Sequence, residues 1–168
     1  RFLVVFLPVF VAMAAAAGWA MIKQIDVPWA MFLYYTGLLA SMSWCFLGIG
    51  MLISTIARSI DVAQGAAFLV WLTMLLFLDL ILLGIMIQGH VSPEAVVALA
   101  LANPLQVFRT AALMLFDPQL VVIGPAAYVI IDYFGGPLFK VYALIYPVVL
   151  GTVAAAGGFM LFRRGDLP

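Results

Sequence analysis

The chain has 168 residues, of which 68% are hydrophobic and only 8% are charged, and its formal net charge is zero. Soluble domains carry about 25% charged residues, and a core of this size cannot hide so much apolar surface. The composition therefore excludes a soluble globular domain and predicts an integral membrane protein. The balanced charge gives no sign of a nucleic-acid-binding surface.

Four apolar segments are long enough to cross a membrane as helices. Each reaches the roughly 20 residues that a helix needs to span the hydrocarbon core, where backbone polar groups must bond internally. They are residues 1–22, 29–56, 65–87 and 138–162. Residue 1 opens directly onto the first segment, with no Met and no signal-peptide features before it, so we expect the C-terminal part of a longer protein.

A short polar turn joins the second and third spans and contains Arg58 and Asp61. The sequence predicts Asp61 as the N-cap of the following helix, with Gln64 completing a capping box. We expect the turn on the cytoplasmic side, where positive residues are favoured. A cap and a topology signal explain both residues, and contact of Arg58 with a cytoplasmic partner is the alternative.

The third span contains a single charged residue, Asp79. At about 1.5 Å per residue, Asp79 would lie about 12 Å inside the outer end of the span. An acid at such a depth is a hypothesis for a functional site. Three interpretations stay open: a protonated or hydrogen-bonded brace between helices, an ion pair with Arg109 or Lys140, and a group that lines a substrate path.

The outer segment, residues 88–137, follows the third span. A short helix is expected over residues 93–102. Asn103 is a good N-cap and Pro104 fits a first helical turn, so a second helix is predicted over residues 104–116. Apolar residues recur along it at helical spacing, which predicts an amphipathic helix at the outer interface. The stripe consists of Leu105, Phe108, Ala112 and Leu115, while Gln106, Arg109 and Thr110 lie off it.

Residues 119–134 are short for a span and are interrupted by Pro125. Charge decides between a fifth span and a partial one, because a fifth span would put Arg163 and Arg164 on the opposite side from Arg58. We therefore interpret this stretch as re-entrant or interfacial, with four spans and both chain ends in the cytoplasm. Aromatic residues gather on the outer side as in an interfacial belt, Tyr142 and Tyr146 among them.

Small residues recur at four-residue spacing in the second and fourth spans, which is compatible with close helix packing. The pairs are Gly37 with Ser41, Gly50 with Ser54, and Ala154 with Gly158.

The sequence offers no convergent catalytic or metal-ligating set. His90 is the only histidine, Cys45 is the only cysteine, and Asp79 has no second acid within a predicted span. A hydrolase needs a base beside its nucleophile, and an intramembrane aspartyl protease needs two carboxylates. We predict no catalytic residue, no metal site and no cofactor in this chain. It has no phosphate-binding loop, so any ATP would be bound by another chain.

Four stretches stand in a characteristic order: LGIGMLISTIARS (47–59), VWLTMLLFLDLILL (70–83), ALANPLQVFRTAAL (100–113) and LFRRGDL (161–167). In this order they resemble the C-terminal part of ABC-2-type ABC transporter permeases. Within that family, the Asp in FLDL, the NPLQVFR helix and the Arg-Arg-x-Asp-Leu end look most like the NosY permeases. Those belong to the transporter that supports copper-centre assembly in nitrous oxide reductase.

The resemblance implies a multi-pass permease of the bacterial inner membrane, with two further spans and a coupling helix before residue 1. It implies a permease homodimer and partner ATPase subunits that bind ATP and magnesium. Outer helices would cap the assembly, where Asn103, Pro104 and Arg109 would contact a partner.

For NosY-like systems the resemblance further implies a periplasmic β-helical partner. ATP-driven transport or conformational signalling would then support copper or sulfur delivery. The alternative is a different class of protein, a non-transporting membrane anchor or structural subunit of a respiratory complex. A channel or proton-coupled carrier would need more polar residues within the membrane than the single Asp79.

Overall fold

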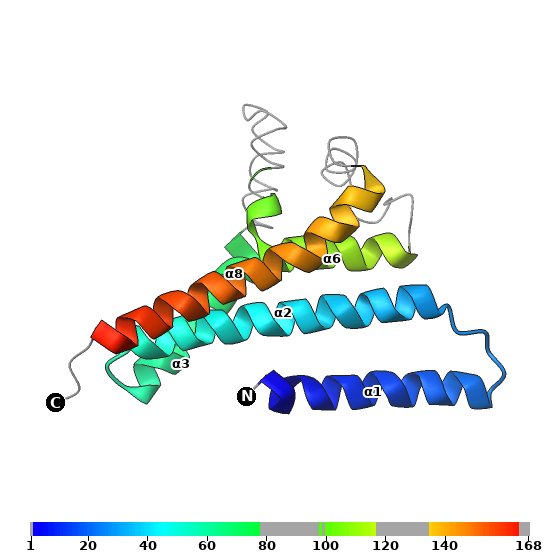
Figure 1. The fold of residues 1–168 in the computed structure, drawn as a ribbon, viewed down its shortest axis with the longest axis horizontal. Helices are drawn as coiled ribbons and strands as arrows, with labels where there is room; N and C mark the ends of the chain where they lie inside the picture. Colours follow the sequence, from blue (N-terminus) through cyan, green and yellow to red (C-terminus); the bar gives the residue numbers. More distant parts are fainter. Residues whose placement is uncertain (1, 78–97, 99, 117–134, 165–168) are drawn as a thin grey trace.

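The computed structural model describes residues 2–77, 98, 100–116 and 135–164, and all regular secondary structure within them is helical (Figure 1). Three of these helices are long and apolar enough to cross a membrane. The chain is therefore a helical, multi-pass membrane protein. In order, the elements are α1 (Phe2–Ile22), α2 (Trp29–Ile56), α3 (Ile60–Leu72), the π-helix η1 (Thr73–Phe77), α6 (Pro104–Phe116) and α8 (Gly136–Arg164).

The predicted spans at 1–22, 29–56 and 138–162 correspond to α1, α2 and α8, with each bound within two residues of the prediction. The predicted span at 65–87 begins inside α3 and runs through η1. Residues 78–87 lie outside the described residues, so this third span stays a prediction. The same holds for residues 119–134 and for most of 93–102, of which residues 100–102 are helical.

The start of α3 differs from the prediction. Ser59, not Asp61, is the N-cap: its backbone is extended and its hydroxyl accepts a hydrogen bond from the amide of Val62 at 3.3 Å. A capping box would need Glu or Gln at position 62, and the chain has Val there. Asp61 instead lies in the first turn, where its negative charge is favourable beside the helix N-terminus.

α2 and α8 form the centre of the structure and run parallel. Contacts between them advance in the same direction along both helices. The Tyr34 hydroxyl donates to the Lys140 carbonyl at 2.9 Å, and the Trp44 indole donates to the Thr152 hydroxyl at 3.0 Å. Further along, Gly158 packs against the backbone of Leu52. Both helices end at the same side of the molecule (Figure 1).

Both helices therefore begin at one end of the bundle and finish at the other. The number of membrane crossings within residues 57–135 stays a prediction, because much of that stretch lies outside the described residues. The arrangement also brings Arg58, just after α2, to the same end as Arg163 on α8, as the charge pattern predicts.

The parallel pair packs so closely because of glycine. A Cβ atom built on Gly48 would lie 2.0 Å from the carbonyl oxygen of Gly151, and one on Gly151 would lie 2.7 Å from the Cα of Cys45. By contrast, Gly50 has no atom within 4 Å of such a position. Backbone-to-backbone contact of this kind is typical of helix pairs in membranes.

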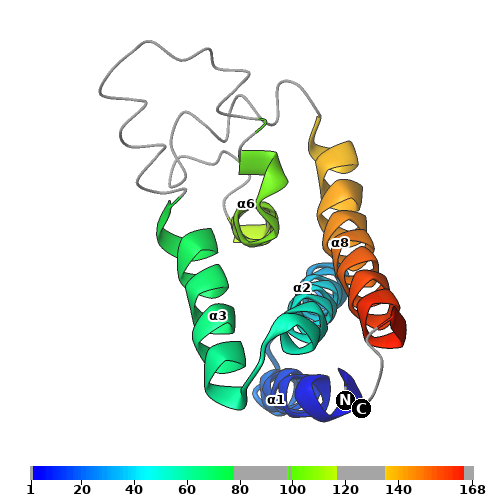
Figure 2. The same cartoon turned by 90° about the vertical axis from the view of Figure 1, so that its left-hand side faces the viewer.

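α1 lies beside α2 but packs loosely (Figures 1 and 2). Ala17 is its only buried residue, and the Phe2 ring meets Trp44 edge-on at 5.4 Å between ring centroids. Large apolar side chains of α1 are widely exposed, Leu3 to 75% and Ile22 to 77%. Such surface is suited to lipid or to further helices.

Candidate functional site at the start of α6

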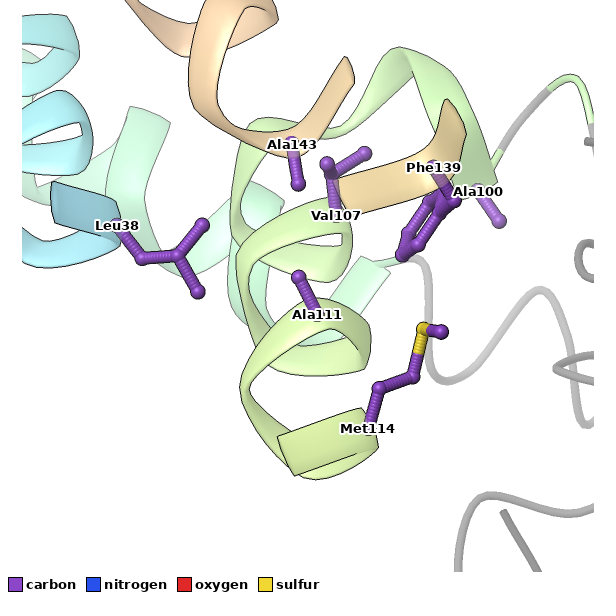
Figure 3. Close-up of a cluster of buried hydrophobic side chains, with 7 residues drawn as sticks. All are labelled: Leu38, Ala100, Val107, Ala111, Met114, Phe139 and Ala143. Atoms are coloured by element: carbon purple, nitrogen blue, oxygen red, sulfur yellow. The ribbon is translucent and has the colours of Figure 1, made fainter. Parts of the chain in front are cut away.

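α6 packs against α2 and α8, and its start lies beside η1 at the end of α3 (Figure 2). Its inner face joins an apolar cluster with α2 and α8, in which the side chains of Ala111, Phe139 and Ala143 are fully buried (Figure 3). The cluster consists of Leu38, Ala100, Val107, Ala111, Met114, Phe139 and Ala143.

α6 runs antiparallel to α8. Ala102, two residues before the start of α6, is bonded to Tyr146, whereas Met114 near the end of α6 meets Gly136. Tyr146 lies ten residues into α8, which is about 15 Å at about 1.5 Å per residue. The helix therefore begins beside Tyr146 and runs toward the end at which α8 starts. Its position relative to the membrane surface stays a prediction.

The buried face of α6 differs in part from the predicted apolar stripe. Leu115 is buried as predicted, but Val107 and Thr110 are each 1% exposed, whereas Leu105 and Phe108 are only half-buried. α2 and α8 both pack against α6. The Thr110 hydroxyl has no hydrogen-bond partner among the described residues.

Asn103 is the N-cap of α6, as predicted. Its side-chain oxygen accepts from the amide of Leu105 at 3.0 Å, and its backbone carbonyl accepts from Val107 at 3.0 Å. The other half of the side chain was not predicted: the amide nitrogen donates to the carbonyl of Met74 in η1 at 2.7 Å. One side chain thus joins the start of α6 to the third helix.

Two tyrosines of α8 complete the attachment. Tyr142 donates to the carbonyl of Leu101 at 3.0 Å, and Tyr146 donates to that of Ala102. Their rings stack at 5.1 Å with an interplanar angle of 11°. Carbonyls at the end of a helix lack intrahelical partners, and in lipid they must find others. Tyr142 and Tyr146 are four residues apart and so lie on one face of α8. This spacing is the sequence feature from which the attachment could have been predicted.

The predicted partner-contact residues separate into two groups. Asn103 is 5% exposed and Pro104 is fully buried, which favours a structural role for both. Arg109 is exposed on the outer side of α6. Arg58 and Asp61 are exposed at the opposite end of the bundle. Asp79 lies outside the described residues, so its three interpretations stay open.

Other parts of the described structure offer no competing site chemistry. Among the described residues, no three His, Cys, Asp or Glu side chains gather as a metal site would require. An open groove of about 560 Å³ lies between the start of α1, the second half of α2 and α8. Its lining is almost wholly apolar: Phe2, Trp44, Phe46, Leu47, Gly48, Gly50, Met51, Ser54 and Ala155.

The fold is that of a multi-pass helical membrane protein in which α6 is anchored between η1 and α8. Comparisons with protein-family models, with curated proteins and with solved structures find no match to this chain.

Proposed function

We propose that the chain is the C-terminal part of an ABC-2-type transporter permease of the NosY kind. It couples ATP hydrolysis by a partner ATPase to transport or conformational signalling across the bacterial inner membrane. Its role is copper or sulfur delivery during nitrous oxide reductase maturation. ATP and magnesium bind to the partner, since this chain has no phosphate-binding loop.

One observation carries the proposal: the helix with the NPLQVFR motif is anchored to two other helices at once. Asn103 holds it to η1, and Tyr146 holds Ala102, at the end of the preceding helical residues, to α8. A movement of either helix therefore acts on α6. A subunit that only anchors another protein has no need for such an attachment, whereas a permease that signals outward does.

The test is purification of the full-length protein from native membranes in mild detergent. We expect a co-purifying ATPase subunit with vanadate-sensitive MgATP hydrolysis, and cells lacking the protein should make nitrous oxide reductase without its copper centres. Isolation with no nucleotide-hydrolysing subunit would contradict the permease proposal. Normal copper centres in such cells would contradict the copper role alone.

Arg109 offers a test of outward signalling. Replacing Arg109 by Ala should weaken binding of an outer partner by about tenfold, or about 1.4 kcal/mol, because an exposed guanidinium is lost from α6. Affinity measured on the full-length protein in nanodiscs checks this. Arg58→Ala is the control, since it removes the same charge at the other end. Loss of membrane insertion in Arg109→Ala would assign a structural role to Arg109 instead.

A further inference from the structure

The third helix changes its geometry at Thr73, where η1 begins. The Thr73 hydroxyl donates to the Leu69 carbonyl at 2.8 Å, which is the carbonyl that the Thr73 amide would take in a regular α-helix. That amide is shared between the carbonyls of Leu69 and Val70. Such back-bonding by Thr loosens the helical ladder and bends helices. It thus favours the wider turn that follows.

The second contact with this turn comes from outside the helix. The Asn103 side chain donates to the Met74 carbonyl at 2.7 Å, one residue into η1. Asn103 is 5% exposed, so water does not compete well for this bond. Two side-chain hydrogen bonds therefore involve adjacent residues at the start of η1. Thr73 donates back to Leu69, and Met74 accepts from Asn103. π-Helical turns are rare, and they occur frequently at functional sites.

We propose that Asn103 is a latch that holds η1 in its π-helical form and couples α6 to the third helix. A π-helical turn accommodates one extra residue, so its conversion to α-helix rotates one part of the helix against the other by about 100° and shifts it by about 1.5 Å. Release of Met74 by Asn103 permits this conversion. Movement of α6 and rotation within the third helix then occur together.

Asn103 has two bonding functions that substitution can separate. Ser is as good an N-cap as Asn, but its side chain is too short to cap Leu105 and also reach Met74. Asn103→Ser therefore removes the latch and keeps the cap, whereas Asn103→Ala removes both. Thr73→Val removes the hydroxyl at the other contact with nearly the same side-chain shape. Tyr146→Phe is the matched control, because it removes a neighbouring hydrogen bond that does not involve η1.

The experiment is amide hydrogen exchange of the full chain in nanodiscs, followed by mass spectrometry over residues 69–77 and 104–116. A hydrogen bond between membrane helices is worth about 1–2 kcal/mol at most, which corresponds to about 5–30-fold in exchange. Asn103→Ser should speed exchange in residues 69–77 by such a factor and leave 104–116 protected. Asn103→Ala should speed both segments, and Tyr146→Phe should leave 69–77 unchanged.

Thr73→Val tests the other side of the latch. We expect faster exchange in residues 69–77 here as well, because one of the two bonds that favour η1 is lost and the turn interconverts between its π-helical and α-helical forms. Wild-type exchange over residues 69–77 in both Asn103→Ser and Thr73→Val would overturn the proposal. Acceleration of both segments by Asn103→Ser would also overturn it, since the side chain would then serve only as a cap. The readout needs no ATPase, so its failure is distinguishable from failure of the transporter proposal.

Discussion

Replacement of Gly48 by Val will separate α2 from α8 and lower the free energy of unfolding by more than about 3 kcal/mol. Overpacking a core costs about 1–3 kcal/mol when side chains can move aside. Here the first added carbon would lie 2.0 Å from the Gly151 carbonyl oxygen, which belongs to the backbone. Neither helix can yield without losing the contacts on either side. Reversible unfolding in detergent by SDS titration, followed by circular dichroism, measures the change.

Gly50→Val is the matched control for this prediction. It lies on the same helix, carries the same change in helix propensity, and has no atom within 4 Å of the added Cβ position. We expect no loss and a gain of at most a few tenths of a kcal/mol, because Val has a slightly higher helix propensity than Gly. Equal losses for the two variants would show that α2 and α8 do not meet through Gly48.

The second large effect is expected at Phe139. Phe139→Ala should lower the free energy of unfolding by about 3 kcal/mol, the lower end of the range of about 3–5 for soluble cores. The ring is fully buried among Val107, Met114 and Ala143. Its removal leaves a cavity where α6 packs against α8. Lipid is as apolar as the core, so most of the loss comes from packing rather than from transfer out of water.

Phe162→Ala serves as the comparison, since Phe162 lies on the same helix and is 58% exposed. Its loss should stay within about 0.5 kcal/mol, as for most surface substitutions. Phe139→Ala should in addition increase proteolysis of α6, because the cluster fixes that helix in place. A stable Phe139→Ala variant with α6 still protected would mean that Asn103 and the tyrosines suffice to hold it.

The positions of the helices follow from local signals. The predicted bounds 29–56 and 104–116 agree with α2 and α6, because Pro28 precedes one start and Asn103 with Pro104 makes the other. The cap of α3 was misplaced because Ser59 and Asp61 both suit that position, and the backbone conformation decides between them. Local sequence therefore predicts that a helix exists better than it predicts its terminal residue.

The site depends on contacts that no local pattern contains. Tyr142 was expected in an interfacial belt, yet its hydroxyl bonds a carbonyl 41 residues away in the chain. The predicted pair of Gly50 and Ser54 lies off the α8 interface, while Gly48 makes the closest contact. Which face of a helix is buried depends on its neighbours, and in an almost wholly apolar chain hydrophobicity no longer distinguishes the faces.

The antiparallel placement of α6 has a consequence for biogenesis. With 13 residues, α6 is too short to insert into a bilayer alone, which takes about 20. The surface on which α6 packs is formed partly by α8, which is synthesised after α6. Membrane helices insert first and associate afterwards. α6 therefore reaches its place only after α8 has been translated and inserted. In a chain whose synthesis stops before α8, the carbonyls of Leu101 and Ala102 lack the Tyr142 and Tyr146 hydroxyls that bond them.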